Sequence, residues 1–263
     1  MGCQIMDEVM WILDDKSIGD VIFVVEGAKN EFSLLKRVLT EILHYEYIRK
    51  NRHEIEFYEK KIEKKIALSR IAVVNTETSN INSLDDINNF LDNDLSKLAF
   101  QYGFDIDNSA IFYIFDRDRQ SNQDISLIRN YIEKFRNPYD NGFDRGGLLL
   151  LSYPAVESYT VSSFIDDAYM MEFALGKNVK TFIGDSGGNL ELTKMNKVSI
   201  LKAVNEMMKY FAVQDIQFVI DQFDKAHLTV LDSQEGYFTD KAAYQCLSLL
   251  SVAFIYLGII ELD

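Results

Sequence analysis

The sequence predicts an α/β protein in which a parallel sheet is flanked by helices. Four short apolar runs alternate with stretches of helical character along the first 160 residues: Val21–Val25, Ile71–Val74, Ala110–Phe115 and Leu148–Leu151. A continuous apolar run of this length suits a strand that is buried on both faces of a parallel sheet. Regular alternation of strands and helices implies right-handed crossovers between parallel strands.

The segments between these strands carry helix signals or turn signals. Residues 1–20 are read as a short helix or irregular lead-in, and apolar residues at helical spacing predict a helix over Asn30–Leu43. The same spacing continues through Ile48–Ile66. Ser83 is a candidate N-cap for a helix that runs to Tyr102, and another helix is predicted over Ser121–Phe135.

After Glu157 the strand signal fades, and we expect a helical extension over residues 161–263 that follows an α/β unit over residues 1–160. The predicted helices are Val161–Leu175, Lys197–Phe211, a stretch around Ile216–Leu228, and Lys241–Ile260. Residues 242–260 contain no charge, which is also typical of a membrane span. Polar residues within the stretch and the acidic end of the chain favour a buried core helix instead.

Composition narrows the class of protein. The chain has 263 residues, 48% of them hydrophobic, and can bury a substantial core. Two cysteines are too few for a disulfide scaffold, and acidic residues interrupt any signal peptide, so we expect a cytoplasmic protein. The net charge of −14 argues against coating nucleic acid by bulk electrostatics. Residues 49–70 carry a local charge of +4, which indicates either a second phosphate contact or a solvated helix face.

Carboxylates follow three of the predicted strands. Glu26 comes directly after the first, Asp116 and Asp118 follow the third, and Glu157 follows the fourth. Ligands of open α/β sheets bind outside the carboxyl ends of the strands. Residues i and i+2 of an extended chain point to the same side, so Asp116 and Asp118 can face one cation. Four carboxylates at one edge repel each other, and a divalent metal ion would neutralise them.

Three motifs together resemble the Toprim fold of topoisomerases, DnaG-type primases and several nucleases. They are VVEGAKNE (24–31), FDRD (115–118) and PAVESY (154–159), and the resemblance covers residues 20–160. Glu26-Gly27 and Asp116-Arg117-Asp118 match the family signature. The later motif is similar to that of OLD-family nucleases and small Toprim effectors of anti-phage systems, although Ser158 stands where Asn is usual.

The resemblance implies phosphoryl transfer with one or two Mg²⁺ or Mn²⁺ ions. Asp116 and Asp118 would be metal ligands, Glu157 would complete the coordination sphere or hold a second ion, and Glu26 would be a ligand or the general acid/base. Glu31 would reach the same cluster, or is an ordinary exposed helix residue. The nearest cations for the scissile phosphate are Lys29, Arg117 and Arg119, although both arginines can equally pair with neighbouring acids.

Other signals are set aside. The string Gly184–Gly188 matches the serine-protease nucleophile motif, but the chain lacks the β-rich character and histidine placement of that class, so a glycine-rich loop is expected. His53 lacks the second histidine of a zinc-protease helix, and His44 and His227 stand alone.

Two classes of function remain. The first is a metal-dependent nuclease that cleaves DNA or RNA, a toxic anti-phage effector controlled by a protein partner, for which an ATPase is one candidate. A ribonuclease that processes rRNA or tRNA is a variant of it. The second is a non-catalytic Toprim-like regulatory or assembly module. Either class could form a homodimer or bind a partner through the helix predicted over Leu247–Ile260. Neither class needs a membrane.

Overall fold

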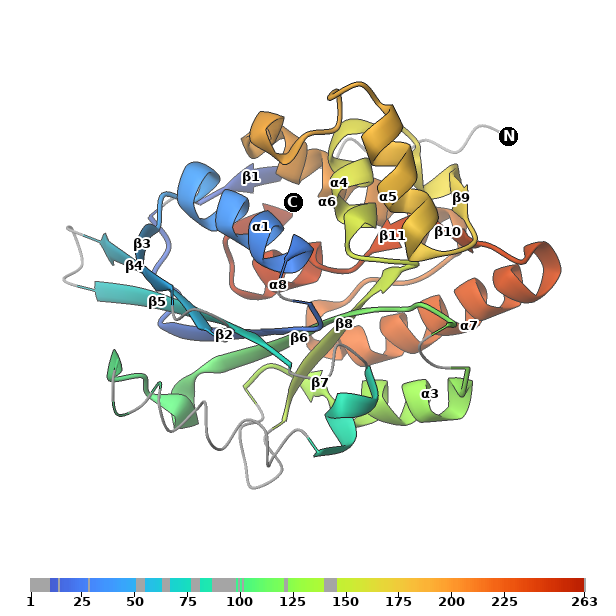
Figure 1. The fold of residues 1–263 in the computed structure, drawn as a ribbon. Helices are drawn as coiled ribbons and strands as arrows, with labels where there is room; N and C mark the ends of the chain where they lie inside the picture. The colour runs from blue at the N-terminus through green and yellow to red at the C-terminus, as the bar shows by residue number, and fades with distance from the viewer. Residues whose placement is uncertain are drawn as a thin grey trace.

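The protein is a mixed sheet with a layer of helices on each face (Figure 1). The computed structural model of the chain describes residues 10–13, 15–27, 29–50, 55–62, 67–76, 81–86, 98, 100, 102–120, 123–139 and 146–262. On one face lie α1, α4, α5, α6 and α8, and on the other lie α3 and α7. The predicted α/β class with a mostly parallel sheet is confirmed.

The four predicted strands form the parallel centre of the sheet. Their order is β8-β6-β2-β5, with bounds β8 Gly147–Tyr153, β6 Ala110–Asp116, β2 Asp20–Val25 and β5 Ala67–Asn75. Antiparallel strands extend both sides: β4 (Ile55–Ile62) and β3 (Glu46–Lys50) beyond β5, and β11 (Leu247–Ser248) and β7 (Arg136–Asn137) beside β8. Because the central strands are parallel, their carboxyl ends lie at one edge.

The helix predicted through the basic stretch is wrong. Residues 46–50 and 55–62 are the antiparallel strands β3 and β4, and β4 pairs with β5 over its whole length. Short apolar stretches satisfy helical and strand periods equally well, and the β-branched and aromatic residues here pack into the sheet. Lys60 donates to the Leu43 carbonyl oxygen at 2.7 Å, so its ammonium has a structural partner.

Helices near the predicted positions cover the sheet. The predicted helix Asn30–Leu43 is α1 (Asn30–Lys36), which continues as a π-helical turn over Arg37–Ile42. Next comes α3 (Ile125–Lys134), which starts four residues later than predicted because the Asp124 carboxylate caps it through the N–H groups of Ser126 and Leu127. The remaining bounds are α4 Glu157–Phe164, α5 Gly176–Asp185, α6 Lys197–Val213 and α7 Phe223–Lys241.

Three predicted helices differ in extent. The helix expected over Val161–Leu175 is α4, which begins and ends earlier and is followed by a 3-10 turn at Ala168–Met170 and strand β9 (Glu172–Phe173). The stretch around Ile216–Leu228 holds a 3-10 turn at Ile220–Gln222 and the start of α7. Most of the helix predicted from Ser83 to Tyr102 lies outside the described residues. Within that range the structure describes part of a 3-10 turn (Ile81–Asp86) and the helical residues Leu98, Phe100 and Tyr102.

The C-terminal stretch is buried as expected but is not one helix. It forms β10 (Tyr244–Gln245), β11, α8 (Ser251–Tyr256) and β12 (Ile260–Leu262), and β12 pairs with β1 (Met10–Ile12) near the N-terminus. Leu247, Leu249 and Leu250 are buried in the protein, so they do not form the free apolar face proposed for dimerisation. Within the described residues, none of the helices combines the length and apolar character needed to cross a membrane.

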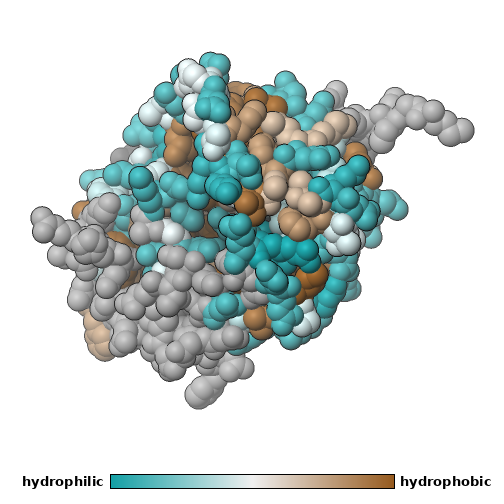
Figure 2. All heavy atoms as spheres, turned by 45° about the vertical axis from the view of Figure 1, so that its right-hand side comes forward, coloured by the Kyte–Doolittle hydropathy of each residue, from teal (hydrophilic) through white to brown (hydrophobic). Residues whose placement is uncertain are grey.

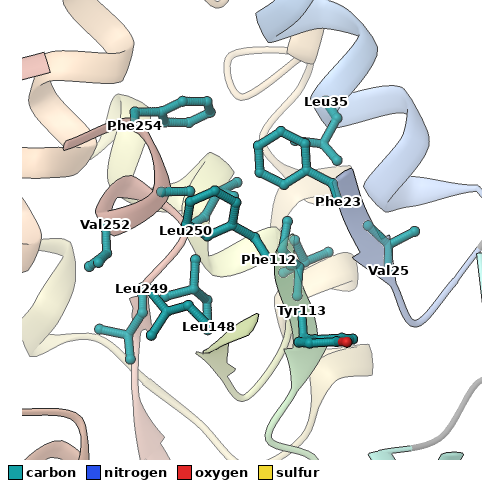
Figure 3. Close-up of a cluster of buried hydrophobic side chains, with 14 of the residues drawn as sticks. Phe23, Val25, Leu35, Phe112, Tyr113, Leu148, Leu249, Leu250, Val252 and Phe254 are labelled. Carbon is teal, nitrogen blue, oxygen red and sulfur yellow. The ribbon is translucent and has the colours of Figure 1, made fainter. Parts of the chain in front are cut away.

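One hydrophobic core joins both halves of the chain. Phe23 and Phe112 stack with ring centroids 5.5 Å apart, and side chains from β8, α1 and the C-terminal segment surround them (Figure 3). Residues after 160 therefore share the core of the sheet and add strands to it, in addition to the predicted helices. Hydrophilic residues cover much of the face in Figure 2, with hydrophobic residues gathered in its upper half.

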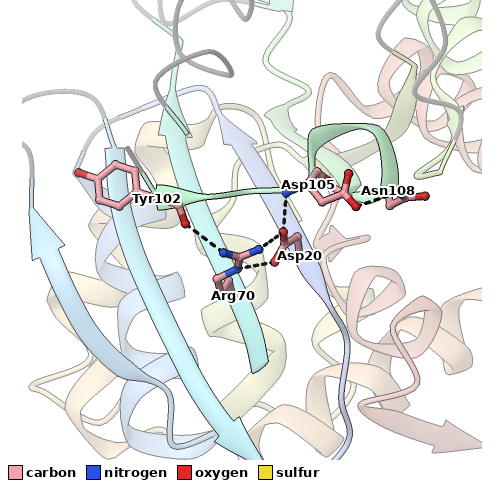
Figure 4. Close-up of polar contacts among 6 residues, drawn as sticks. Asp20, Arg70, Tyr102, Asp105 and Asn108 are labelled. Carbon is pink, nitrogen blue, oxygen red and sulfur yellow. Dashed lines mark hydrogen bonds and ion pairs between the residues drawn. The ribbon is translucent and has the colours of Figure 1, made fainter. Parts of the chain in front are cut away.

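The amino-terminal edge of the parallel strands is closed by an ion pair. Arg70 donates to both carboxylate oxygens of Asp20 at 2.7 and 2.6 Å and to the Tyr102 carbonyl oxygen at 3.0 Å (Figure 4). The N–H of Asp105 donates to the same carboxylate at 2.8 Å. Arg70, one of the cations of the basic stretch, is thus engaged within the fold, and the opposite edge is the candidate site.

Candidate active site

Strand register brings the predicted carboxylates to one edge of the sheet. Val25 is aligned with Ile114, and Asp116 is aligned with Ser152, so β2, β6 and β8 end side by side. Glu26 directly follows β2, Asp116 is the last residue of β6, and Glu157 begins α4 shortly after β8. The chain thus places carboxylates from three strand ends in one region.

Glu26 and Asp116 are held by backbone groups. The Asp116 N–H donates to Glu26 Oε2 at 2.9 Å, and the Val156 N–H donates to Asp116 Oδ1 at 2.7 Å. Burial raises the pKa of Glu26 to about 7, and the charges of Glu31 and Asp118 act in the same direction. Burial also raises the pKa of Asp116 well above its usual range, as do the charges of Glu26, Glu31 and Glu157. These carboxyls are therefore close enough to disfavour each other's ionised form.

Glu31 belongs to this cluster and is not an exposed helix residue. It is buried in the first turn of α1, and a methyl group added to Gly27 would lie 2.8 Å from its Oε2 atom. Burial raises the pKa of Glu31, and the charge of Glu157 adds to the effect. Gly27 therefore leaves the space into which the Glu31 carboxylate folds back.

Glu157 has one engaged oxygen and one orphaned oxygen. Asn30 Nδ2 donates to Glu157 Oε1 at 2.6 Å, and Lys180 Nζ lies 3.5 Å from the same oxygen. Glu157 is only 9% exposed, and within the described part of the chain its Oε2 atom is buried without a hydrogen-bond partner. A buried carboxylate oxygen without a partner is unfavourable, and a bound cation or a proton donor on a substrate would relieve it.

Asp118 lies at the outer end of this group. It is half-buried, and its Oδ1 atom accepts a hydrogen bond from the Gln120 N–H at 2.9 Å. Its charge contributes to the raised pKa of Glu26, which places it within electrostatic range of the other carboxylates.

Arg117 and Arg119 both contact a helix on the opposite face of the sheet. Arg117 Nε lies 2.7 Å from Glu235 Oε1 on α7, and Arg119 Nε lies 3.4 Å from Glu235 Oε2. Arg117 is 1% exposed, so the prediction that it binds a substrate phosphate is wrong. Arg119 shares the same partner and packs over the Phe238 ring at 4.8 Å, which fits the alternative of a charge partner for a neighbouring acid. Alternation along an extended chain explains this, because Asp116 and Asp118 take one side and the arginines take the other.

A lysine that sequence analysis missed supplies positive charge to the carboxylates. Lys180 lies on α5, outside the region of the family resemblance. Its burial lowers the pKa, but the nearby charges of Glu157, Asp116 and Glu31 outweigh burial and raise it. No motif surrounds Lys180, and only the packing of α5 beside α4 brings it to the site. Lys29 is exposed and immediately precedes α1, so it remains a candidate for contact with phosphate.

A cavity of about 430 Å³ opens beside these residues. It shares Glu157 and Lys180 with the carboxylate cluster and also borders Lys29 and Asn30. A volume of this size falls within the range of roughly 300–1,000 Å³ that is typical of small-molecule sites.

Carboxylate oxygens are the donors that Mg²⁺ and Mn²⁺ prefer, and the orphaned Glu157 oxygen fits such an ion. Among the described residues, however, no three His, Cys, Asp or Glu side chains are arranged as a ready set of metal ligands. Binding of such an ion would therefore require the carboxylates of Asp116, Asp118 and Glu157 to turn toward a shared point. Comparison with family models, with characterised proteins and with solved structures finds no match to this chain.

Proposed function

We propose that this protein is a metal-dependent nuclease with a Toprim-like active site. The observation that carries the proposal is the gathering of Glu26, Asp116 and Glu157 from three adjacent strand ends, with carboxyl pKa values raised at Glu26 and Asp116. A cluster of buried acids with no functional role would only lower the stability of the fold. Clusters of this kind occur where a protein binds a cation or moves a proton.

The carboxylates and lysines of the site would have separate roles in phosphodiester hydrolysis. A divalent ion held by Asp116, Asp118 and Glu157 would neutralise the phosphate and lower the pKa of an attacking water. Glu26, with a pKa of about 7, can take a proton from that water or give one to the departing oxygen near neutral pH. The water oxygen forms a bond to phosphorus while the bond from phosphorus to one ester oxygen breaks. Lys180 and Lys29 would bind the non-bridging oxygens.

The biological setting is part of the proposal and rests on the family resemblance. A nuclease effector of an anti-phage system would be restrained or triggered by a protein partner, such as an ATPase, and its substrate would be DNA, tRNA or other RNA. The uneven charge of the chain, −14 overall, fits an enzyme whose contacts with nucleic acid are confined to a small site. Expression of the wild type alone should harm cells, and expression of Glu26→Ala should not.

Calorimetric titration with Mn²⁺ and Mg²⁺ tests the proposal without knowledge of the substrate. We expect binding to the wild type, loss of binding in Asp118→Ala, and retention in Asp232→Ala, a control on α7 at the opposite face. A cleavage screen over plasmid DNA, single strands and tRNA follows. If neither metal binds and no substrate is cut, the nuclease proposal is wrong.

One observation favours the non-catalytic module as a second candidate. Lys180 already places an ammonium group beside the carboxylates, and a resident cation can satisfy an acidic cluster in a scaffold. In that case amides can replace the carboxylates of Glu26, Asp116, Asp118 and Glu157 without loss of biological function. The toxicity assay measures this.

A further inference from the structure

The cavity beside the carboxylates has two kinds of wall. Its aliphatic side chains are Leu34, Val156, Ile183, Leu190 and Leu192, and its charged and polar ones come mainly from α1, α4 and α5. A site with an apolar wall and convergent polar groups suits a ligand that has both an apolar body and a charged substituent.

Two lysines and two carboxylates border this cavity, and the lysines are the candidates for contact with an anionic ligand. Glu157 Oε1 is engaged by Asn30 and Lys180, its Oε2 atom is the oxygen left for the metal ion of the proposed function, and Glu191 Oε2 accepts from the Thr193 hydroxyl at 3.1 Å. The Lys29 ammonium, by contrast, makes no hydrogen bond or ion pair within the described part of the chain. Lys29 and Lys180 border the same space. The part of a ligand that lies between them should therefore be anionic.

The cavity also adjoins the carboxylate cluster, because Glu157 and Lys180 belong to both. An anionic group bound by Lys180 would therefore lie beside the carboxylates, in the same cavity as the apolar wall. The volume of about 430 Å³ accommodates one nucleotide and is too small for a segment of duplex.

We infer that this cavity binds one nucleotide of the substrate, with its phosphate between Lys29 and Lys180 and its base against the wall formed by Leu34, Ile183 and Leu190. The inference rests on the proposed function and names the substrate class for it. A base that is stacked and paired in a duplex cannot enter such a cavity, so the substrate is single-stranded or has an extruded nucleotide at the cleavage site.

Binding of adenosine 5′-monophosphate, adenosine and inorganic phosphate to the full chain tests this inference, in buffer with Mg²⁺ and in buffer with EDTA. We expect the nucleotide to bind at least about tenfold more tightly than either fragment, the equivalent of roughly 1.4 kcal/mol. Equal affinity for phosphate and nucleotide would reveal a simple anion site and overturn the role given to the apolar wall.

Ser33 offers a matched pair of variants for the cavity. It is exposed on α1, borders the cavity, and its hydroxyl donates to the Lys29 carbonyl oxygen at 2.7 Å, so we assign it no contact with the ligand. Ser33→Trp should fill the space and abolish nucleotide binding. Ser33→Ala removes the same hydroxyl without filling the space and should retain binding. Circular dichroism melting of both variants checks that the fold is intact.

Lys29→Gln tests the phosphate contact, with Lys177→Gln as the control. Lys177 is an exposed lysine of α5 that does not border the cavity. We expect Lys29→Gln to weaken nucleotide binding about tenfold, as loss of a charge-assisted hydrogen bond does, and Lys177→Gln to leave it unchanged. Equal effects of the two substitutions would mean that binding responds to the net charge of the protein and not to a specific contact, which would overturn the assignment of Lys29.

The outcomes separate this inference from the nuclease proposal. Nucleotide binding that persists in EDTA and is lost in Ser33→Trp supports the cavity, even if no metal binds and nothing is cut. Metal binding that depends on Asp118, together with cleavage but without nucleotide binding in either buffer, overturns the cavity and leaves the nuclease.

Discussion

The carboxylate of Glu26 accepts a hydrogen bond from the backbone N–H of Asp116 at 2.9 Å, which ties the end of β2 to the end of β6. This bond uses the backbone of Asp116 and leaves its carboxylate to accept from the Val156 N–H. Main-chain donors at the end of β6 and at the start of α4 therefore position the two acids. Substitution of one acid should change the charge of the site without dismantling its framework.

Glu26→Gln should change how stability depends on pH. The pKa of Glu26 is raised from 4.5 to about 7 in the folded protein, so between these pH values the folded chain keeps a proton that the unfolded chain has lost. Stability of the metal-free wild type therefore falls as the pH rises through this window, by up to about 3 kcal/mol from this group. Glutamine stays neutral, so the variant should match the wild type near pH 4 and exceed its stability at pH 8.

Urea unfolding in EDTA across this pH range measures the effect. Glu133→Gln, at an exposed position of α3, is the control and should follow the wild-type profile. Parallel profiles for Glu26→Gln and the wild type would contradict the raised pKa. Because Asp116 and Glu31 are coupled to Glu26, the difference between profiles reports on the cluster as a unit.

Lys180→Gln should separate metal binding from catalysis. Its ammonium lies 3.5 Å from Glu157 Oε1, so its removal leaves the carboxylates more attractive to a divalent ion. We expect Mn²⁺ affinity to rise about threefold to tenfold and the cleavage rate to fall at least about tenfold, because a phosphate contact is lost. Lys177→Gln should change neither quantity. A fall in metal affinity would show that Lys180 positions the ligands and does not compete with the ion.

Arg117→Met should destabilise the fold and spare the site. The substitution leaves the buried Glu235 carboxylate without its 2.7 Å partner, and loss of one member of a buried ion pair destabilises by about 3–5 kcal/mol. Arg129→Met, which breaks a surface pair with Asp232, should change stability by less than about 1 kcal/mol. Denaturant unfolding compares them, and Mn²⁺ affinity of folded Arg117→Met should equal that of the wild type. If Arg117→Met is stable but binds substrate poorly, Arg117 contacts a substrate phosphate after all.

The central strands and the carboxylates at their ends could be predicted from the sequence, because Glu26 and Asp116 each directly follow an apolar run. Val21–Val25 and Ala110–Phe115 are apolar on both faces, which only a buried central strand requires, and parallel direction then brings Glu26 and Asp116 together. The direction of Arg117 was also predictable, since alternation from Asp116 sends it to the other face.

Other features depend on packing that no local pattern encodes. Residues 55–62 fit a helical period and a strand period, and only pairing with β5 decides between them. The stretch after Lys241 is apolar enough to be buried in any form, so burial was predictable while its division into β11, α8 and β12 was not. Lys180 reaches the site because α5 packs on α4, and no motif around Lys180 indicates this contact.

Gly27→Ala tests whether Glu31 acts at the metal site. The added methyl group would meet the Glu31 carboxylate at 2.8 Å, and the end of that flexible side chain can move aside, so the fold should tolerate the change. If Glu31 is a ligand, Gly27→Ala and Glu31→Gln should each weaken Mn²⁺ binding about tenfold, and the double variant should be no weaker than either, because both act through one carboxylate. Gly236→Ala, where nothing lies within 4 Å of the new methyl group in the exposed middle of α7, should leave Mn²⁺ binding unchanged and stabilise the protein by roughly 0.5–1 kcal/mol. Additive losses in the double variant would mean that Gly27 and Glu31 act separately, and unchanged Mn²⁺ affinity of Glu31→Gln would place Glu31 outside the metal site.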